Sequence, residues 1–255
     1  MENAASIDKA IDVLFYLHRA PSACGVTAIG RALGIPKSSV HRLLAAWVRG
    51  GLVDRTGGEY RPGIGLLALG LGVLEREPVV VGGRPVLEEF AGRLGETLFL
   101  VSAHGGGLRV LDKVEGQGFL RAAPQIGGQV PVHATAVGKL YLAFARQSLS
   151  ESEADLRRPF TDRTLTGEVE LAHEVERIRD RGVAWNRDEW ISGLSVVAAP
   201  VQMSGRMLAA VAIALPTSRL PELGEEMLAA EVRAAARHIG ERLSGDRMAV
   251  SQSTE

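Results

Sequence analysis

The sequence predicts an α+β protein with two parts: short helices and a hairpin at the N-terminus, then an antiparallel sheet with separate helices. Apolar residues recur at helical spacing over residues 7–48, and Pro21 and Gly34 interrupt them. Later in the chain, glycine doublets and triplets separate short runs of strand-forming residues, which is the pattern of β-hairpins. Strands joined by hairpins, with helices set apart from them, indicate an α+β fold.

Length and composition favour a soluble protein of one large domain or two small ones. A chain of 255 residues is long enough for two cores, and 46% hydrophobic with 23% charged residues is ordinary for globular proteins. The single cysteine, Cys24, permits no internal disulfide and fits a reducing compartment. The start has no signal-peptide pattern, and the longest apolar run, 207–215, is far below the roughly 20 residues that span a bilayer. We therefore expect a cytoplasmic protein with no membrane partner.

Three short helices open the chain. The spacing of apolar residues predicts helices over 7–17 and 26–33, and a third begins at Pro36, which suits a first helical turn. Gly34 between the last two can adopt positive φ at the turn. The third helix carries a full apolar stripe, which predicts that one of its faces is buried. The stripe consists of Val40, Leu43, Leu44, Trp47 and Val48.

Two helices joined by a tight glycine turn predict a helix-turn-helix, with Gly30 small where the helices approach. Strands over 52–56 and 59–61 flank Gly57-Gly58 and predict a hairpin. A hairpin in this place is the wing of a winged helix-turn-helix. The DNA major groove admits one helix, whose N-terminal residues reach the base edges. The N-terminal part is thus predicted to bind double-stranded DNA.

Charge is distributed in a way that fits this function. The formal net charge is −1, which argues against a uniformly basic nucleic-acid binder. Residues 34–61, however, hold five basic side chains against two acidic ones, a local charge of +3. We expect Arg42 to read a base and the wing to contact phosphates, although helix capping is an alternative for Ser38 and Ser39. The DNA-binding candidates are Lys37, Ser38, Ser39, His41, Arg42, Arg55, Thr56 and Arg61.

One such module carries little charge, so we expect a dimer on a two-fold operator. Residues 63–78 are apolar at nearly helical spacing and predict a helical linker. This linker either pairs with its copy in a partner chain or caps the core of the first domain. The predicted domains are a DNA-binding domain at 1–62, the linker at 63–78, a second domain at 79–245, and a polar tail at 246–255 that we expect to be disordered.

The second domain alternates strands and helices. Gly105-Gly106-Gly107 separates two expected strands as a hairpin, and a long helix is expected to end the domain. The expected helices cover residues 81–93, 136–145, 168–181 and 222–243. The expected strands cover residues 97–103, 108–114, 119–123, 183–186, 195–201 and 207–215.

Three stretches resemble the IclR family of bacterial transcription regulators: "GIPKSSVHRLL" at 34–44, "VPVHATAVGKLYLA" at 130–143 and "RGVAWNRDEWISGLSVVAAPV" at 181–201. The resemblance covers nearly the whole chain. It implies a winged helix-turn-helix joined to a GAF-like (profilin-like) effector-binding domain, assembled as a dimer or a tetramer. It also implies a ligand-responsive regulator, and for such a protein we expect no catalytic residues, cofactor or metal.

The segment "PVHATAVGK" predicts an anion site. Small residues lie just before and within a first helical turn, where backbone N–H groups and the helix dipole favour a carboxylate. The resemblance places a small acid near Val130, Ala136 and Val137, facing strands that carry Asn186, Leu194, Val196, Ala212 and Ala214. Some relatives are polar at these strand positions, whereas this chain is mostly apolar. We therefore expect an acid with an apolar or aromatic body; core packing is the alternative for each residue.

Other chemistries fit less well. A phosphate-binding loop would need glycine at His133 and Ser or Thr at Leu140, and the histidines show no metal-ligand spacing. We expect His133 to be a hydrogen-bonded structural histidine and Arg187-Asp188-Glu189 to form a solvated turn. An enzyme of small organic acids with a DNA-binding head is the alternative function.

Overall fold

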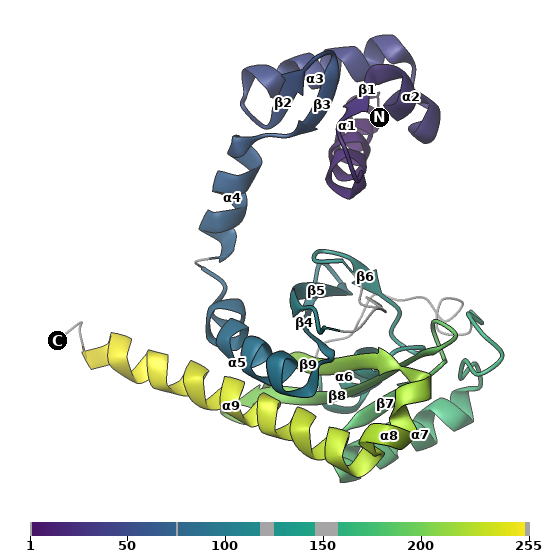
Figure 1. The fold of residues 1–255 in the computed structure, drawn as a ribbon, viewed down its shortest axis with the longest axis vertical. Coiled ribbons are helices and arrows are strands. Elements are labelled where there is room, and N and C mark those ends of the chain that lie inside the picture. The colour runs from purple at the N-terminus through teal and green to yellow at the C-terminus, as the bar shows by residue number, and fades with distance from the viewer. Residues whose placement is uncertain (1, 75, 118–124, 146–157, 253–255) are drawn as a thin grey trace. The chain divides into compact units, whose positions relative to one another are not determined.

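A computed structural model describes residues 2–74, 76–117, 125–145 and 158–252 (Figure 1). The chain divides into two compact units, Met1–Arg76 and Glu77–Glu255. The boundary falls within the predicted linker. The expected strand at 119–123 lies outside the described residues.

The first unit packs three helices and a small sheet around one core. Strand order is β1-β3-β2, with both pairings antiparallel. The core includes Val13, Ile29, Val40, Leu44 and Tyr60, so each helix and the hairpin contributes to it. The elements are α1 (Glu2–Arg19), β1 (Cys24–Gly25), α2 (Val26–Leu33), α3 (Lys37–Arg49), β2 (Val53–Thr56), β3 (Glu59–Pro62) and α4 (Ile64–Leu74).

The second unit is a six-stranded antiparallel sheet in the order β6-β5-β4-β9-β8-β7, with helices on both faces. In Figure 1, α9 runs along the sheet beside α5. Its helices are α5 (Pro78–Leu94), α6 (Ala136–Phe144), α7 (Glu168–Arg181), the short η2 (Thr217–Arg219) and α8 (Leu220–Leu223), and α9 (Glu225–Gln252). Its strands are β4 (Thr97–His104), β5 (Gly107–Val114), β6 (Gln129–Val130), β7 (Ala184–Arg187), β8 (Leu194–Met203) and β9 (Arg206–Pro216).

Alternation along the strands separates two cores. In β9, Val211, Ile213 and Leu215 pack with α5 and α9, whereas alanines at 210, 212 and 214 face α6. Successive side chains of a strand point to opposite faces, so the same strand presents large residues to one layer and small ones to the other. The small residues lie on the face where the effector site is predicted.

The predicted tail is the main difference from the expected elements. We expected the last helix to end near Leu243 and a disordered tail to follow, but α9 continues through Gln252. The polar composition of this segment does not prevent a helix, because its Ala, Met and Arg residues favour helix formation. The two-residue strands β1 and β6 were also missed, since two residues give no periodic pattern.

Candidate DNA-binding surface and effector cavity

Glycine sets the geometry of the turn between α2 and α3. Gly34 has φ of 65°, and the N–H of Ile35 donates to the carbonyl of Gly30 at 3.0 Å. A Cβ added at Gly30 would lie 2.8 Å from the carbonyl oxygen of Ile35, closer than real Cβ atoms approach. Both glycines are therefore required where the sequence places them.

The start of α3 presents the predicted polar face to solvent. Lys37, Ser38, His41 and Arg42 are exposed, and Ser39 is partly so, while Val40 and Leu44 of the same helix are fully buried. The helix begins after Pro36 without a side-chain capping bond. Helix capping therefore does not account for Ser38 and Ser39. These polar groups remain available for a partner.

The wing side chains are less free than those of α3. Arg55 lies with its guanidinium carbon 5.6 Å from the centroid of the Tyr60 ring, a cation–π arrangement that orients it. Arg61 is opposite Asp54 in the β2–β3 register and forms a 3.7 Å ion pair with it. Thr56 is exposed at the hairpin end. Arg61 would have to exchange an exposed ion pair for a phosphate, which costs little.

A small cavity lies where the effector site is predicted, between α6 and the sheet. Six of the predicted residues line it: Val130, Ala136, Val137, Asn186, Leu194 and Val196. Ala212 and Ala214 do not; they are buried beside it in the same core. Phe99, Thr135 and Trp190 line the cavity and were missed. Thr135 precedes a helix start, a capping signal that the sequence does contain, whereas nothing local marks Phe99 or Trp190.

The N-terminus of α6 is built for close approach. The hydroxyl of Thr135 accepts a hydrogen bond from the N–H of Gly138 at 3.1 Å and donates to the carbonyl of Pro131. A Cβ at Gly138 would overlap the carbonyl of Val132, so only glycine fits there. The N–H groups of Ala136 and Val137 precede the first intrahelical bond. With the helix dipole they can hold an anion at the cavity wall.

The Asn186 side chain connects two segments of this cavity wall by hydrogen bonds. Its Nδ2 donates to the carbonyl of Ala134 at 2.9 Å, and its Oδ1 accepts from the N–H of Glu189 at 2.9 Å. Its side chain is buried and both ends of the amide are engaged. Asn186 therefore fixes the segment before α6 against the β7–β8 turn and uses one of its two Nδ2 N–H donors to do so.

A buried ion pair ties α6 to the same turn. Lys139 Nζ donates to both carboxylate oxygens of Glu189 at 2.7 Å, and the Lys139 side chain is 1% exposed. Burial lowers the pKa of Lys139 and raises the pKa of Glu189, while each charge opposes the shift of the other. The pair thus compensates for burying two charges and locks the helix to the turn.

The expectation of a solvated turn at Arg187-Asp188-Glu189 was wrong. Glu189 is buried against Lys139, and Arg187 pairs with Glu225 at 2.7 Å. Asp188 has φ of 62°, and its Oδ1 accepts hydrogen bonds from the N–H of Gly193 and the hydroxyl of Thr217. A row of charged residues suggests a solvent-facing turn, but distant partners bury Glu189 and leave Arg187 and Asp188 half-exposed.

His133 agrees with its expected role. It is fully buried, and its Nε2 lies 2.9 Å from the carbonyl oxygen of Arg158. Its ring lies 5.8 Å from that of Phe160. Within the described residues, no group of three or more His, Cys, Asp or Glu side chains is placed to hold a metal ion. No helix of the described chain is long and apolar enough to cross a membrane.

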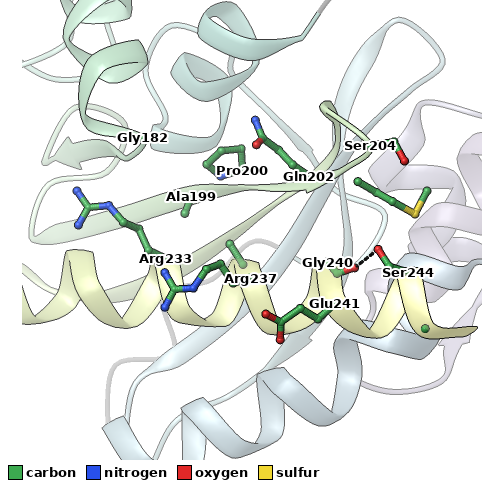
Figure 2. A pocket seen from close by; sticks show the side chains of 13 residues that line it. Gly182, Ala199, Pro200, Gln202, Ser204, Arg233, Arg237, Gly240, Glu241 and Ser244 are labelled. Carbon is green, nitrogen blue, oxygen red and sulfur yellow. Dashed lines mark hydrogen bonds between the residues drawn. The ribbon is translucent and has the colours of Figure 1, made fainter.

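A larger hollow lies elsewhere, on the α9 side of the sheet. It is an open groove of about 870 Å³ between β8 and α9. Figure 2 shows Ala199, Pro200 and Gln202 on one wall, and Arg233, Arg237 and Glu241 on α9. No predicted effector residue lines it. The predicted site is instead the small enclosed cavity beside α6.

Comparison with known proteins identifies the chain. The IclR helix-turn-helix domain matches residues 6–57, and the family described as "Bacterial transcriptional regulator IclR C-terminal" matches residues 71–241. The chain is 31% identical to the DNA-binding transcriptional repressor YiaJ of Escherichia coli K12, over 93% of this chain and 87% of that protein. The chain belongs to the IclR family. It is a DNA-binding transcriptional regulator with an N-terminal helix-turn-helix domain and a C-terminal effector domain.

Other IclR-family relatives cover nearly the whole chain. The glycerol operon regulatory protein of Streptomyces coelicolor is 31% identical over 96% of this chain and 98% of that protein. The IclR structure of Thermotoga maritima has a TM-score of 0.77 at 27% identity, covering 94% and 99% of the two chains. An IclR homologue of Microbacterium hydrocarbonoxydans, solved with 4-hydroxybenzoate, has a TM-score of 0.80 at 22% identity, covering 94% and 99%. The last likeness shows a shared fold.

Proposed function

We propose that this regulator binds a pseudo-palindromic operator as a dimer and responds to a small carboxylate with an apolar or aromatic body. The observation that carries the proposal is the cavity beside α6. It combines backbone N–H groups at a helix N-terminus with walls such as Phe99, Leu194 and Val196. Because operator DNA lies in the bacterial cytoplasm, we place its action there.

The engaged polar groups favour an apolar ligand body. Thr135 and Asn186 in the described lining already form internal hydrogen bonds, and the other lining side chains are apolar apart from the indole N–H of Trp190. Each hydroxyl or amide of a polar ligand left unpaired there would cost about 1–3 kcal/mol. The Microbacterium structure supports this choice, since the same fold there accommodates an aromatic acid.

Effector binding must enlarge the cavity. Its volume is about 10 Å³, whereas roughly 10–15 Å³ is needed for a single water molecule. Trp190 is a half-buried wall residue, next in sequence to the buried ion-pair residue Glu189. Displacement of this wall by the ligand would act on Lys139 of α6. We propose this route as the start of the response to effector.

Exposed apolar surface supports a dimer. Ile7, Ile11 and Phe15 form a stripe along α1 and are 47–60% exposed, and α4 exposes five further apolar side chains. Most apolar residues of the 63–78 segment face solvent, which argues against the alternative that this segment caps the first core. We propose that these two helices meet their copies in the partner chain. The exposed residues of α4 are Ile64, Leu67, Leu69, Leu71 and Val73.

The test is a gel-shift titration of the full-length protein on the intergenic DNA beside its own gene, with and without a panel of acids. We expect a specific shift that an aromatic or branched acid changes and a small polar acid does not. The variant Val196→Phe, which fills the cavity, should bind the same DNA without responding. A response only to highly polar acids contradicts the proposed effector class. No shift on any fragment, together with turnover of an acid, contradicts the proposed regulator.

A further inference from the structure

A second recess opens next to the effector cavity. Its volume is about 510 Å³, within the size range of small-molecule sites. The Gly105–Gly107 turn forms one side, and Arg109, Arg158, Phe160 and Trp190 lie around it. The recess shares two wall residues with the effector cavity, Val130 and Trp190. It is therefore a neighbour of that cavity and separated from it by two side chains.

The described part of the recess lining carries positive charge. Among the described residues that line it there are two arginines and no Asp or Glu. One N–H of Arg109 donates to the carbonyl of Gly127 at 3.0 Å. Neither arginine forms an ion pair within the described chain. A guanidinium has five N–H donors in a planar fork that matches a carboxylate. The two side chains thus leave most of their donors to solvent or to a ligand.

The aromatic side chains of Phe160 and Trp190 also line the recess. The Arg158 guanidinium carbon lies 5.3 Å from the centroid of the Phe160 ring, which orients the charge. Phe160 lies against the buried His133, and His133 also contacts the carbonyl of Arg158. Trp190 stands in the turn that Asp188 and Glu189 fix. Two aromatic rings beside two oriented cations are suited to a flat anion.

We propose that this recess is a second ligand site of the effector domain, which takes an aromatic carboxylate. The carboxylate binds Arg109 and Arg158, and the ring packs against Phe160 and Trp190. The site is separate from the anion site at the α6 N-terminus. Because Trp190 is a wall of both, an occupant of the recess lies against the side chain whose displacement starts the proposed effector response.

Isothermal titration of the full-length protein with benzoate tests the proposal. The double variant Arg109→Gln with Arg158→Gln is compared with Arg237→Gln, which removes one positive charge on α9, and with Val196→Phe, which fills the inner cavity. We expect the double arginine variant to weaken recess binding at least about tenfold, since it removes charge-assisted hydrogen bonds. Arg237→Gln and Val196→Phe should leave that binding unchanged. Thermal unfolding of each variant confirms that it folds.

Acetate and benzyl alcohol serve as probes that lack the ring and the charge. Each should bind the recess more weakly than benzoate. Benzoate binding that Val196→Phe abolishes and the arginine changes leave intact would overturn the recess and leave the proposed effector cavity standing. Binding lost only in the arginine variant supports the recess and counts against the inner cavity. No benzoate binding by the unaltered protein up to about 10 mM overturns the recess as a site for this class.

Discussion

Arg42 projects from α3 into solvent, while Leu43 and Leu44 beside it belong to the core cluster of the first unit. The helix holds the backbone of Arg42 rigidly, yet its guanidinium has no partner within the described chain. Arginine is the side chain that most often contacts guanine O6 and N7 in the major groove. A fixed backbone with a free planar fork is the arrangement that base reading requires.

Replacing Arg42 with Ala should weaken operator binding by about 1–3 kcal/mol and relax the preference at one base position. Fluorescence anisotropy on a set of single-base operator variants measures both effects. Arg49→Ala, in the last turn of the same helix, is the control and should cost less, because the N-terminal part of a recognition helix reaches the bases. An equal loss on every operator variant would make Arg42 a phosphate contact.

Lys139 and Glu189 illustrate a residue-scale effect on stability. Lys139→Met alone leaves a buried carboxylate without its cation, and we expect a loss of about 3–5 kcal/mol in the free energy of unfolding. The double variant Lys139→Met with Glu189→Leu should lose less than the two single variants together. Urea unfolding of the four proteins forms the double-mutant cycle. Additive losses would show that the two charges do not stabilise each other.

The start of α6 derives its position from three contacts along one element. Thr135 caps the helix, Gly138 lets it approach Val132, and Lys139 fixes it to the β7–β8 turn. The cavity wall is thus a product of helix packing, and the free N–H groups of the first turn are held where a carboxylate can meet them. A helix N-terminus without these contacts would have the same dipole, but its N–H groups would not be held at the cavity wall.

A charged substitution in the apolar stripe of α1 tests the proposed dimer contact. Ile11→Glu places a carboxylate in the middle of the stripe, so it should weaken self-association and reduce operator affinity with it. His18→Glu, at an exposed polar position of the same helix, should change neither by a comparable amount. Sedimentation equilibrium measures association, and anisotropy measures DNA binding. A monomeric native protein that still binds a two-fold operator tightly would refute the proposed dimer.

At the scale of the whole molecule, the two units have separate cores. The second unit packs its sheet between two helical layers and needs no residue of the first for its core. A fragment of residues 77–255 should therefore unfold cooperatively and bind the effector without binding DNA. Circular dichroism melting and titration calorimetry check this. A fragment without a cooperative transition would mean that the first unit completes its core.

The sequence predicted most of the regular elements because their signals are local. Helices α2 and α7 have the predicted bounds, since glycine follows each and periodic apolar residues fill them. Six of the eight residues predicted for the effector site line the cavity beside α6, and effector binding there stays a prediction. Ala212 and Ala214 do not line it, because a strand's face is set by its pairing while the cavity wall depends on which side chains fill the space.

By itself, the sequence determined the order of the elements, the turn at Gly34, the polar face of α3 and the presence of a small-residue helix start at Ala136. These follow from periodicity, glycine and proline, which act within a few residues. The tertiary structure alone decided three features. Glu189 is buried against Lys139, Asn186 hydrogen-bonds to Ala134 and Glu189, and Trp190 lines both the inner cavity and the recess. Each joins segments dozens of residues apart, so their partners are determined by packing and burial rather than by any local pattern.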